Sequence, residues 1–342
     1  MDNIEYYKEK INTCLKKFLD RKLEEDGKYS NEIRNLIENV IEYNLRGGKR
    51  IRPVTIIFAY KSFEDKDDDR IIDAAISLEL MQAFLLIHDD IMDKSDLRRG
   101  GETIHKIYEK KYGKDFGVSM AILAGDLLCS YTYDCITESN FDNLQKVNAI
   151  KYLSWIINRE VYGQTIDIIP GFENLSEKDI WKIYELKTAT YTMQGPIYLG
   201  CVLANAPIEK IKKLQEYAHN LGIAFQIQDD LNGIFCSIDK LGKPNNCDIN
   251  EGKKTLIIVK TLELCNKEDK EFLLNNYGKQ NIDQESIEKI GKIIKNCGAY
   301  DYCLNKFKEL VEIAKNSLKD VELNTEGKNN LIEMADYISS LL

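Results

Sequence analysis

The spacing of apolar residues is the feature that most limits what this chain can fold into. Residues 33–41 place isoleucine, leucine or valine at positions i, i+3, i+4, i+7 and i+8, and Gly47-Gly48 ends that segment. No stretch alternates convincingly with period two, whereas the helical period continues almost to the C-terminus. The spacing predicts long helices over residues 71–93, 115–137, 142–167, 176–204 and 208–236, with shorter helices after residue 253.

Few breaks interrupt these helices. The 342 residues include five prolines, and no stretch rich in proline, glycine or serine separates two compositions. A chain of this length with 44% hydrophobic residues can build a sizeable core. The sequence therefore predicts an all-α fold, with residues 1–342 in one domain.

Composition excludes several classes of function. A net charge of −9 argues against a nucleic-acid partner recruited by overall charge. No segment approaches the roughly 20 uninterrupted apolar residues of a membrane span, and the first ten residues are charged, which favours the cytoplasm. Nine cysteines without a Cys-x-x-Cys pair fit reduced core thiols, as at Cys129, Cys135 and Cys201. Three histidines are too few to favour a histidine-based metal site.

Two groups of aspartates follow apolar runs. Asp89, Asp90 and Asp93 follow residues 85–87, and Asp229 with Asp230 follows residues 225–228. On a helix, the three carboxylates of the first group would meet within one turn and repel one another. Mg²⁺ removes that repulsion, because it prefers oxygen ligands and is usually completed by substrate phosphates. We interpret the two groups as walls of one metal site for a phosphorylated substrate.

A simpler interpretation is a network of salt bridges between aspartates and nearby arginines, such as Arg98 and Arg99. For one acidic group alone that interpretation would be a serious competitor. Two groups in one chain, each at the end of an apolar run, favour the metal site.

Basic segments supply the opposite charge. Residues 47–53 place three cations within four positions at a helix break, where glycine backbone can approach a phosphate closely. Further cations follow the first aspartates, lie inside the apolar segment near Leu186, and follow the second aspartates. Each alone would suit a solvated surface. Their repeated proximity to glycine or to the aspartates predicts a diphosphate site.

These motifs, taken in order, resemble the trans-prenyltransferase family, the head-to-tail isoprenyl diphosphate synthases. The matching segments are GGKRIRP (47–53), LELMQAFLLIHDDIMD (78–93), LRRG (97–100), AGDLL (124–128), GQTID (163–167), KT (187–188), FQIQDD (225–230), GKP (242–244) and EGKKT (251–255). The resemblance implies a bundle of long helices around a central cavity, and a homodimer.

The resemblance also implies roles for the matching residues. Asp89, Asp90, Asp93, Asp229 and Asp230 would hold Mg²⁺ on the allylic diphosphate. Arg98, Lys187, Gln226, Lys243 and Lys253 would bind that diphosphate directly. Lys49, Arg52, Gln82 and Arg99 would bind isopentenyl diphosphate, the second substrate. Asp126, Gln164 and Asp167 match family positions too, and we expect them to orient lysines or metal-bound water.

The mechanism implied is ionisation followed by attack. Metal and lysines neutralise the departing diphosphate, so that the allylic C–O bond ionises. The double bond of isopentenyl diphosphate, positioned by its own diphosphate, then attacks the carbocation. The Thr188 hydroxyl, the Lys187 carbonyl and the Gln226 side chain would stabilise positive charge, and the released diphosphate would take the final proton.

Two positions bear on metal binding and on product length. Gly233 stands where the full family pattern has a third aspartate, which leaves Asp229 as the principal ligand of the second group. Five residues before Asp89, Phe84 would form the floor that stops the growing chain, with Leu85 beside it and Met81 and Ser77 below. This pattern resembles short-chain synthases, and we expect geranylgeranyl diphosphate, with farnesyl diphosphate a close second.

Other functions compete with this one. A terpene cyclase on the same fold would ionise an allylic diphosphate without isopentenyl diphosphate, and would not need Lys49, Arg52 and Arg99. A non-catalytic partner subunit of a synthase typically loses the first aspartate motif, which is intact here. A His-Asp phosphohydrolase would need more histidines than the chain supplies.

Overall fold

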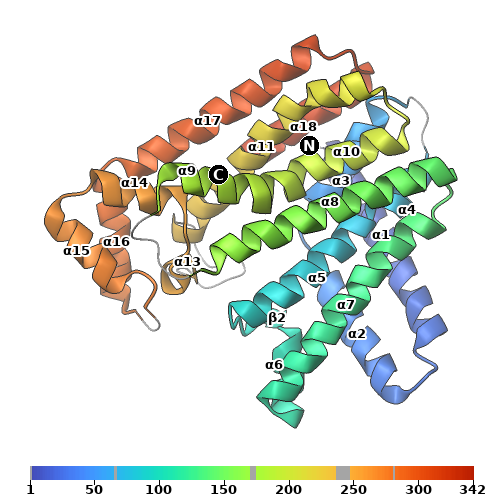
Figure 1. Ribbon diagram of the computed structural model, residues 1–342, viewed down its shortest axis with the longest axis horizontal. Coiled ribbons are helices and arrows are strands. Elements are labelled where there is room, and N and C mark those ends of the chain that lie inside the picture. The colour runs from blue at the N-terminus through green and yellow to red at the C-terminus, as the bar shows by residue number, and fades with distance from the viewer. Residues whose placement is uncertain (1, 65–67, 170–174, 236–246, 280–281) are drawn as a thin grey trace. The chain divides into compact units, whose positions relative to one another are not determined.

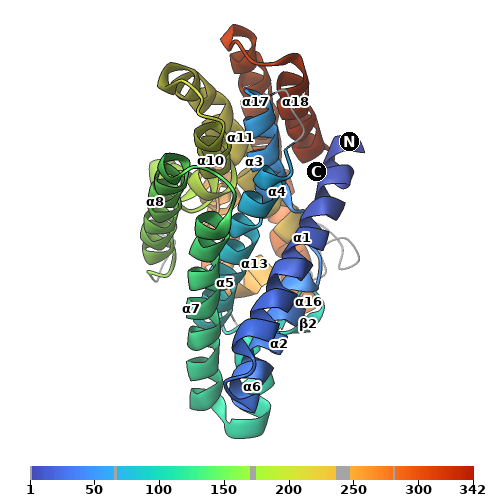
Figure 2. The same cartoon turned by 90° about the vertical axis from the view of Figure 1, so that its right-hand side faces the viewer.

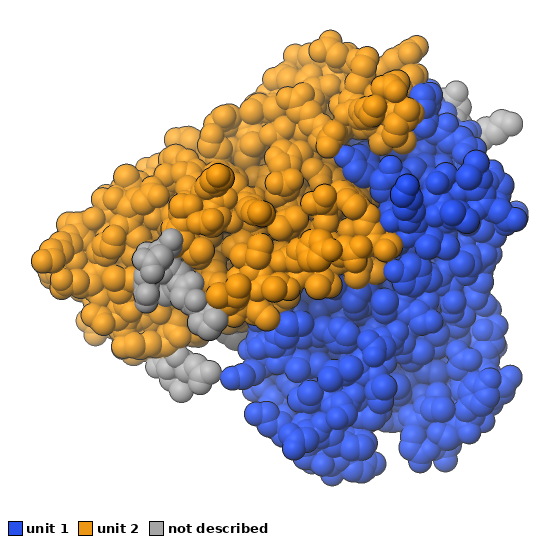
Figure 3. Space-filling view, viewed as in Figure 1, with its two compact units in different colours: residues 1–153, 196–207, 323–331 blue, residues 154–195, 208–322, 332–342 orange. Residues whose placement is uncertain are grey.

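The computed structural model describes residues 2–64, 68–169, 175–235, 247–279 and 282–342, and these residues are almost entirely helical (Figure 1 and Figure 2). The described strands are β1 (Leu97–Arg98) and β2 (Gly101–Glu102), which pair antiparallel. The predicted all-α fold is confirmed. Figure 3 shows two compact units, residues 1–153, 196–207 and 323–331 in unit 1 and residues 154–195, 208–322 and 332–342 in unit 2.

Unit 1 is built mainly from the first half of the chain. Within it, α5 packs along α7, and α7 also packs against α6. Its elements are α1 (Asp2–Asp26), α2 (Asn31–Leu45), α3 (Ile51–Lys61), α4 (Arg70–Ala75), α5 (Ser77–Met92), the two strands, α6 (Ile104–Tyr112), α7 (Lys114–Glu138), the first part of α8 (Asn143–Asp167), most of α10 (Gly195–Leu203) and the first part of α18 (Thr325–Ser340).

The first helix was not among those predicted. In α1, Ile4, Tyr7, Ile11 and Leu15 are buried at spacings of three and four residues. These positions form one apolar face, which packs inside unit 1. The signal was therefore present in the sequence, interspersed with the charged residues of the N-terminus.

Unit 2 is built around α11, which packs against α17 and against the π-helix η1. Figure 1 shows α11 and α17 running side by side. Its elements are the second part of α8, α9 (Glu177–Ile183), η1 (Tyr184–Gln194), α11 (Ile208–Phe235), α13 (Cys247–Glu251), α14 (Leu256–Leu264), α15 (Lys267–Asn276), α16 (Gln284–Asn296), α17 (Ala299–Ser317), the 3₁₀-helix η2 (Leu318–Asp320) and the end of α18.

The predicted long helices agree with the structure in extent and differ in continuity. Residues 71–93 form α4 and α5 with a break at Ile76, and residues 176–204 form three consecutive helical segments. The middle segment, η1, is π-helical. Such wide turns usually mark functional sites, and the apolar spacing does not reveal them.

Two helical stretches are long and apolar enough to cross a membrane by length and composition alone. In residues 70–92, 72% of the most apolar stretch is buried inside the protein. In α7 the buried share is 39%. The cysteines that the structure describes are free thiols, among them buried Cys135 and Cys201.

Candidate active site

The first aspartates lie at the C-terminal end of α5, in unit 1. Asp89 is in the last turn, with its side chain 24% exposed, and Asp93 caps the helix and is exposed. The backbone amide of Asp93 donates to the carbonyl of Asp89 at 2.8 Å. Two carboxylates at the end of one helix can therefore reach an ion in solvent.

Asp90 differs from its neighbours, because its side chain is 1% exposed and both of its oxygens accept hydrogen bonds. Oδ1 accepts from Nε of Arg98 at 2.8 Å, and Oδ2 accepts from the Tyr43 hydroxyl at 2.8 Å. Burial raises the pKa of Asp90, and the Arg98 guanidinium opposes that shift. The structure gives Asp90 protein partners, and its role as a metal ligand stays a prediction.

A two-residue turn sets the positions of the arginine pair. Arg98 pairs with Gly101, and the residues between them, Arg99 and Gly100, have φ values of 51° and 77°. Two consecutive left-handed residues are the geometry of a tight hairpin turn. The turn separates the two side chains: Arg98 binds Asp90, whereas Arg99 donates from Nη1 to the carbonyl of Gly47 at 2.6 Å.

That last contact joins the hairpin to the glycine segment between α2 and α3. Gly47 and Gly48 have φ values of 90° and 145°, which favour glycine. A Cβ on Gly48 would lie 3.2 Å from the guanidinium carbon of Arg99. The structure thus brings the second arginine of LRRG against the GGKRIRP segment.

The other residues predicted for isopentenyl diphosphate lie on the same unit. Lys49 is exposed, Arg52 is half-buried in the first turn of α3, and Gln82 is half-buried on α5. Asp126, predicted to play a supporting role, is exposed on α7.

The predicted floor residues lie farther back along α5. Phe84 and Met81 are buried, whereas Leu85 is half-buried. The Phe84 ring packs edge-on against His88 at 6.0 Å between ring centroids. The His88 ring in turn contacts Gly125, where a Cβ would lie 2.2 Å from Nε2. Close contact between α5 and α7 therefore fixes the surroundings of Phe84.

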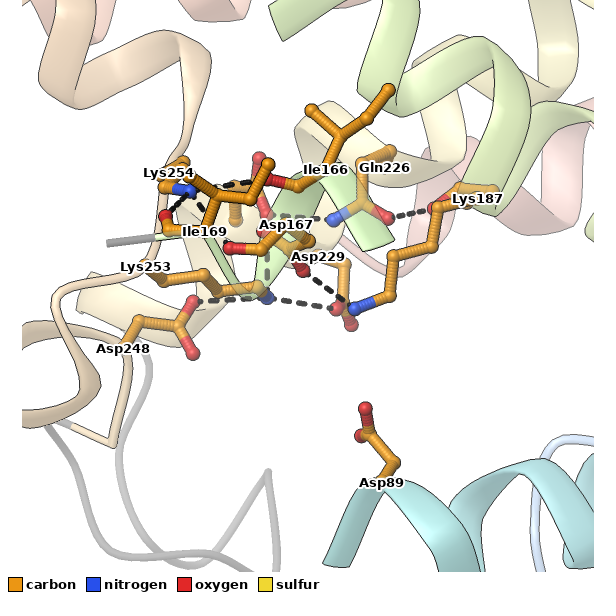
Figure 4. Close-up of polar contacts among 12 residues, drawn as sticks. Asp89, Ile166, Asp167, Ile169, Lys187, Gln226, Asp229, Asp248, Lys253 and Lys254 are labelled. Carbon is orange, nitrogen blue, oxygen red and sulfur yellow. Dashed lines mark hydrogen bonds and ion pairs between the residues drawn. The ribbon is translucent and has the colours of Figure 1, made fainter. Parts of the chain in front are cut away.

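The second aspartates lie on α11, in unit 2 (Figure 4). Asp229 is open, with its side chain 46% exposed, whereas that of Asp230 is 3% exposed. Asp230 accepts hydrogen bonds from the Tyr184 hydroxyl and, at 2.7 Å, from Nε2 of Gln226. Burial raises the pKa of Asp230 to about 7, although Lys253 opposes the shift. Here too, the structure gives the buried aspartate protein partners.

Lys253 lies among three carboxylates. Its Nζ is 3.5 Å from Asp230, 4.0 Å from Asp229 and 3.4 Å from Asp248. Figure 4 shows Lys253 pointing toward Asp229 and Asp248. Burial disfavours the charged lysine, yet Asp248, Asp230 and Asp229 outweigh that effect and raise its pKa. Lys253 is therefore a cation that the protein itself holds between the aspartates.

Asp248, which the sequence analysis did not single out, occupies the space beside Gly233. A Cβ on Gly233 would lie 2.1 Å from Oδ2 of Asp248. A side chain at position 233 would therefore require the Asp248 carboxylate to move. The departure from the family pattern at Gly233 thus coincides with a carboxylate supplied by α13. Only the tertiary structure reveals that Asp248 lies beside Gly233, because the two residues are separated by fifteen positions.

The π-helix η1 carries Lys187 and Thr188. Lys187 donates from Nζ to Asp167 at 2.6 Å, and the Thr188 hydroxyl donates to the side-chain oxygen of Gln226. A Cβ on Gly163 would lie 2.8 Å from that of Lys187, so α8 approaches η1 closely at this point. Asp167 therefore holds the Lys187 ammonium, and the role of this lysine in binding diphosphate stays a prediction.

Tyr184 and Lys254 also organise unit 2, and the sequence analysis gave them no role. The Tyr184 hydroxyl accepts from the amide of Leu256 at 2.8 Å while donating to Asp230. Lys254 donates to the carbonyls of Ile166 and Asp167, in the last turn of α8, and of Ile169, just beyond it (Figure 4). Lys243, predicted to bind the allylic diphosphate, lies outside the described residues.

The donor set suits Mg²⁺. Asp89 and Asp93 in unit 1, and Asp229 in unit 2, each offer carboxylate oxygens, which are the hard ligands that this ion prefers. Among the described residues no three acidic, histidine or cysteine side chains already converge at metal-binding distances. Mg²⁺ commonly keeps several waters and takes further oxygens from substrate phosphates, so a sparse protein contribution fits it.

Comparison with known proteins identifies the family. The polyprenyl synthetase family profile matches residues 34–294. The chain belongs to the polyprenyl synthetase family. A short chain isoprenyl diphosphate synthase of Methanocaldococcus jannaschii is 34% identical over 289 residues, covering 84% of this chain and 81% of that protein.

Two further comparisons support membership of the polyprenyl synthetase family. A geranylgeranyl diphosphate synthase of Sulfolobus acidocaldarius is 32% identical over 321 residues, covering 87% of this chain and 93% of that one. The crystal structure of geranylgeranyl pyrophosphate synthase from Corynebacterium glutamicum, complexed with isoprenyl diphosphate and magnesium, has a TM-score of 0.93 at 29% identity and covers 99% of both chains. The predicted family, the helical fold and the assignment as a prenyltransferase enzyme are confirmed.

Proposed function

We propose that this protein joins isopentenyl diphosphate head-to-tail to allylic diphosphates and makes a short-chain trans-prenyl diphosphate. The observation that carries the proposal is the contact of Arg99 with Gly47 in unit 1. It gathers the cations of two separate motifs around a glycine backbone that can approach a phosphate closely. An enzyme that only ionises an allylic diphosphate has no use for this second anion site.

The open aspartates Asp89, Asp93 and Asp229 would hold Mg²⁺ on the allylic diphosphate. When bound, the ion would neutralise charge that develops on the leaving diphosphate. Asp90 and Asp230, which the sequence analysis also assigned to the metal, would act through their protein partners, by holding Arg98 and Lys253 near the site. This division follows from the exposure of the five carboxylates.

The cationic side chains of the proposal have defined supports. Arg98 would bind the allylic diphosphate while Asp90 fixes its guanidinium, and Lys187 would do so while Asp167 fixes its ammonium. Charged donors already in place cost little reorganisation when the C–O bond breaks. Lys243 would join them.

Positive charge on the substrate would meet oxygen atoms of η1 and α11. The Thr188 hydroxyl donates a hydrogen bond to the side-chain oxygen of Gln226, so the lone pairs of the hydroxyl oxygen can face a carbocation. Gln226 is oriented in turn by its amide hydrogen bond to Asp230. The released diphosphate, still held by the lysines, would accept the proton that ends the condensation.

Product length follows from the residues behind Asp89. One helical turn is about 5.4 Å, so Phe84 lies somewhat more than a turn from the metal-binding end of α5. A buried aromatic ring there would stop the chain early. We propose geranylgeranyl diphosphate as the main product and farnesyl diphosphate as the next.

The proposal includes a homodimer in the cytoplasm. In unit 1, α7 exposes Ile122 and Leu123, and α8 exposes Leu144 and Val147. Exposed apolar side chains commonly mark a protein interface where they form a contiguous patch. Light scattering would give a dimer mass for the wild type and a lower mass for Leu123→Asp if this face is used; an unchanged dimer would place the interface elsewhere.

Omitting one substrate tests the reaction class. The purified protein should consume geranyl diphosphate with Mg²⁺ only when isopentenyl diphosphate is also present, and the product should remain a diphosphate ester. Cyclic hydrocarbon formed without isopentenyl diphosphate would establish a cyclase instead. No turnover with both substrates would favour a non-catalytic subunit.

A further inference from the structure

A buried carboxylate in unit 1 has no part in the reaction proposed above. Glu79 lies in the first turn of α5 and is 3% exposed. Its Oε2 accepts a hydrogen bond from Nη1 of Arg50, which is buried to the same extent. Removing two charges from water is costly, and such a pair is stable only with good geometry and further hydrogen bonds.

Arg50 has those further hydrogen bonds. Its Nε donates to the side-chain oxygen of Asn12 at 2.9 Å, and its Nη2 donates to the backbone carbonyl of Asn44 at 3.0 Å. One guanidinium therefore ties α1, the end of α2 and the start of α5 together. All three elements belong to unit 1.

The backbone of Arg50 is strained. The residue has φ 52° and ψ 27°, the left-handed region, and stands directly before α3 without a side-chain cap. A non-glycine residue in that region costs about 1–3 kcal/mol and persists only where its surroundings impose it. Here the surroundings are the buried contacts of the Arg50 side chain, of which Glu79 is the only charged one among the described hydrogen bonds and ion pairs.

Glu79 also balances the charge of a second arginine. Burial lowers the pKa of Arg99, and the Glu79 carboxylate is the foremost influence that opposes this. Arg99 holds the other end of the same segment, through the carbonyl of Gly47. The segment from Gly47 to Arg50 is thus fixed at one end by Arg99 and at the other by the Arg50–Glu79 pair.

We infer that Glu79 is a positioning residue for the second substrate: through Arg50 it imposes the left-handed turn that sets the backbone carrying Lys49 and Arg52. The inference rests on the proposed function for the identity of that substrate, isopentenyl diphosphate. It predicts that loss of the Arg50–Glu79 pair weakens the binding of isopentenyl diphosphate alone, because the residues assigned to the allylic diphosphate lie on other segments.

The test replaces both members of the pair, as Arg50→Met with Glu79→Met. Apolar side chains of similar size usually replace a buried ion pair without loss of stability, whereas removal of one partner leaves a buried charge. The KM for isopentenyl diphosphate should rise about ten- to a hundredfold, the penalty typical of a misplaced substrate contact. The KM for farnesyl diphosphate should stay within about twofold. Glu79→Gln, which preserves shape and removes only the charge, should move the same KM in the same direction.

A second readout does not depend on turnover. Amide hydrogen exchange of residues 47–50 should quicken in the double variant while that of α7 does not change. Lys22→Met is the matched control, because it removes another buried cation of unit 1, one that pairs with Asp134 and Glu138 on α7. This control should leave both KM values and the exchange of residues 47–50 as in the wild type.

Two results would overturn the inference. One is a double variant with unchanged exchange at residues 47–50, and the other is an equal rise of both KM values. An inactive wild type would contradict the proposed function instead, and the exchange measurement would still decide whether the pair fixes the segment.

Discussion

The two aspartate groups share a sequence pattern, with a partly exposed and a buried aspartate in each, yet they differ in the residue at the fifth position. In each group the first aspartate is open and the second is buried against protein donors: Asp89 and Asp90 in unit 1, Asp229 and Asp230 in unit 2. The fifth position separates them. Asp93 is an exposed carboxylate, whereas Gly233 has none and lies against Asp248.

The charges that balance the two groups differ as well. In unit 1, Arg98 lies on a short hairpin and forms an ion pair with Asp90. In unit 2, Lys253 lies among three carboxylates of α11 and α13. An aspartate motif therefore cannot be equated with a set of metal ligands. The more exposed aspartates, Asp89 and Asp229, can reach an ion although each also lies about 4 Å from a protein cation, whereas the buried ones are held by closer protein donors.

The largest expected effect comes from separating Asp89 from Asp90. Asp89→Ala should lower kcat by at least about 10³-fold with little change in stability, because a metal contact is worth several kcal/mol. Asp90→Ala should instead lower the free energy of unfolding by about 3 kcal/mol, because it leaves the buried Arg98 with only the more distant Asp89, at 3.9 Å, as an ion-pair partner. Steady-state kinetics and urea unfolding measure the two. Equal stability losses in both variants would break the comparison.

The next effect concerns the second group. Asp229→Ala should cost about 10²- to 10³-fold in kcat as the open ligand of unit 2. Asp248→Ala should cost about ten- to a hundredfold, the usual range for a residue that supports a metal site from behind. For both variants we would measure kcat and the Mg²⁺ concentration that gives half-maximal rate. If Asp248→Ala had no effect on either quantity, the carboxylate beside Gly233 would have no part in the site.

A steric prediction follows from the contact between Gly233 and Asp248. Gly233→Ala should lower the free energy of unfolding by about 1 kcal/mol, the low end of the overpacking range, because the Asp248 carboxylate beside this half-buried position must move aside. Asp248→Gly should restore most of that loss when the two changes are combined. Thermal unfolding of the single and double variants would show it, and purely additive losses would contradict the shared space.

Phe84→Ala should have the smallest effect on rate and should change the chain length of the product. Removing the ring opens space below the first aspartates, so the products should shift to longer chains while condensation continues. Chromatography of the dephosphorylated products measures the shift as a ratio, which a loss of folded protein does not alter. Leu85→Ala serves as the neighbouring control, and an unchanged ratio for Phe84→Ala would place the floor at another residue.

Sequence reasoning reached the fold and the elements that carry the site, because apolar spacing reports helices directly. It gave α7, α8 and α11 to within one residue of the observed ends. It could not see that Ile76 divides α4 from α5, or that Lys187 and Thr188 stand on a π-helix, since neither changes the apolar spacing.

The supporting contacts were the part that sequence could not supply. The pairs Tyr43–Asp90, Tyr184–Asp230 and Gly233–Asp248 join residues far apart along the chain, and each depends on how helices pack. Asp167 is the exception, because its place in a matched motif suggested that it orients lysines or metal-bound water, and it does contact Lys187. What remained hidden was which aspartate of each pair is buried.

The measurement that tests the account most directly is the mass of the product made from farnesyl diphosphate. The wild-type protein, given farnesyl diphosphate, carbon-13-labelled isopentenyl diphosphate and Mg²⁺, should yield geranylgeranyl diphosphate that carries one labelled five-carbon unit, and Asp89→Ala should yield none. Label-free products, or labelled product undiminished in Asp89→Ala, would contradict the account.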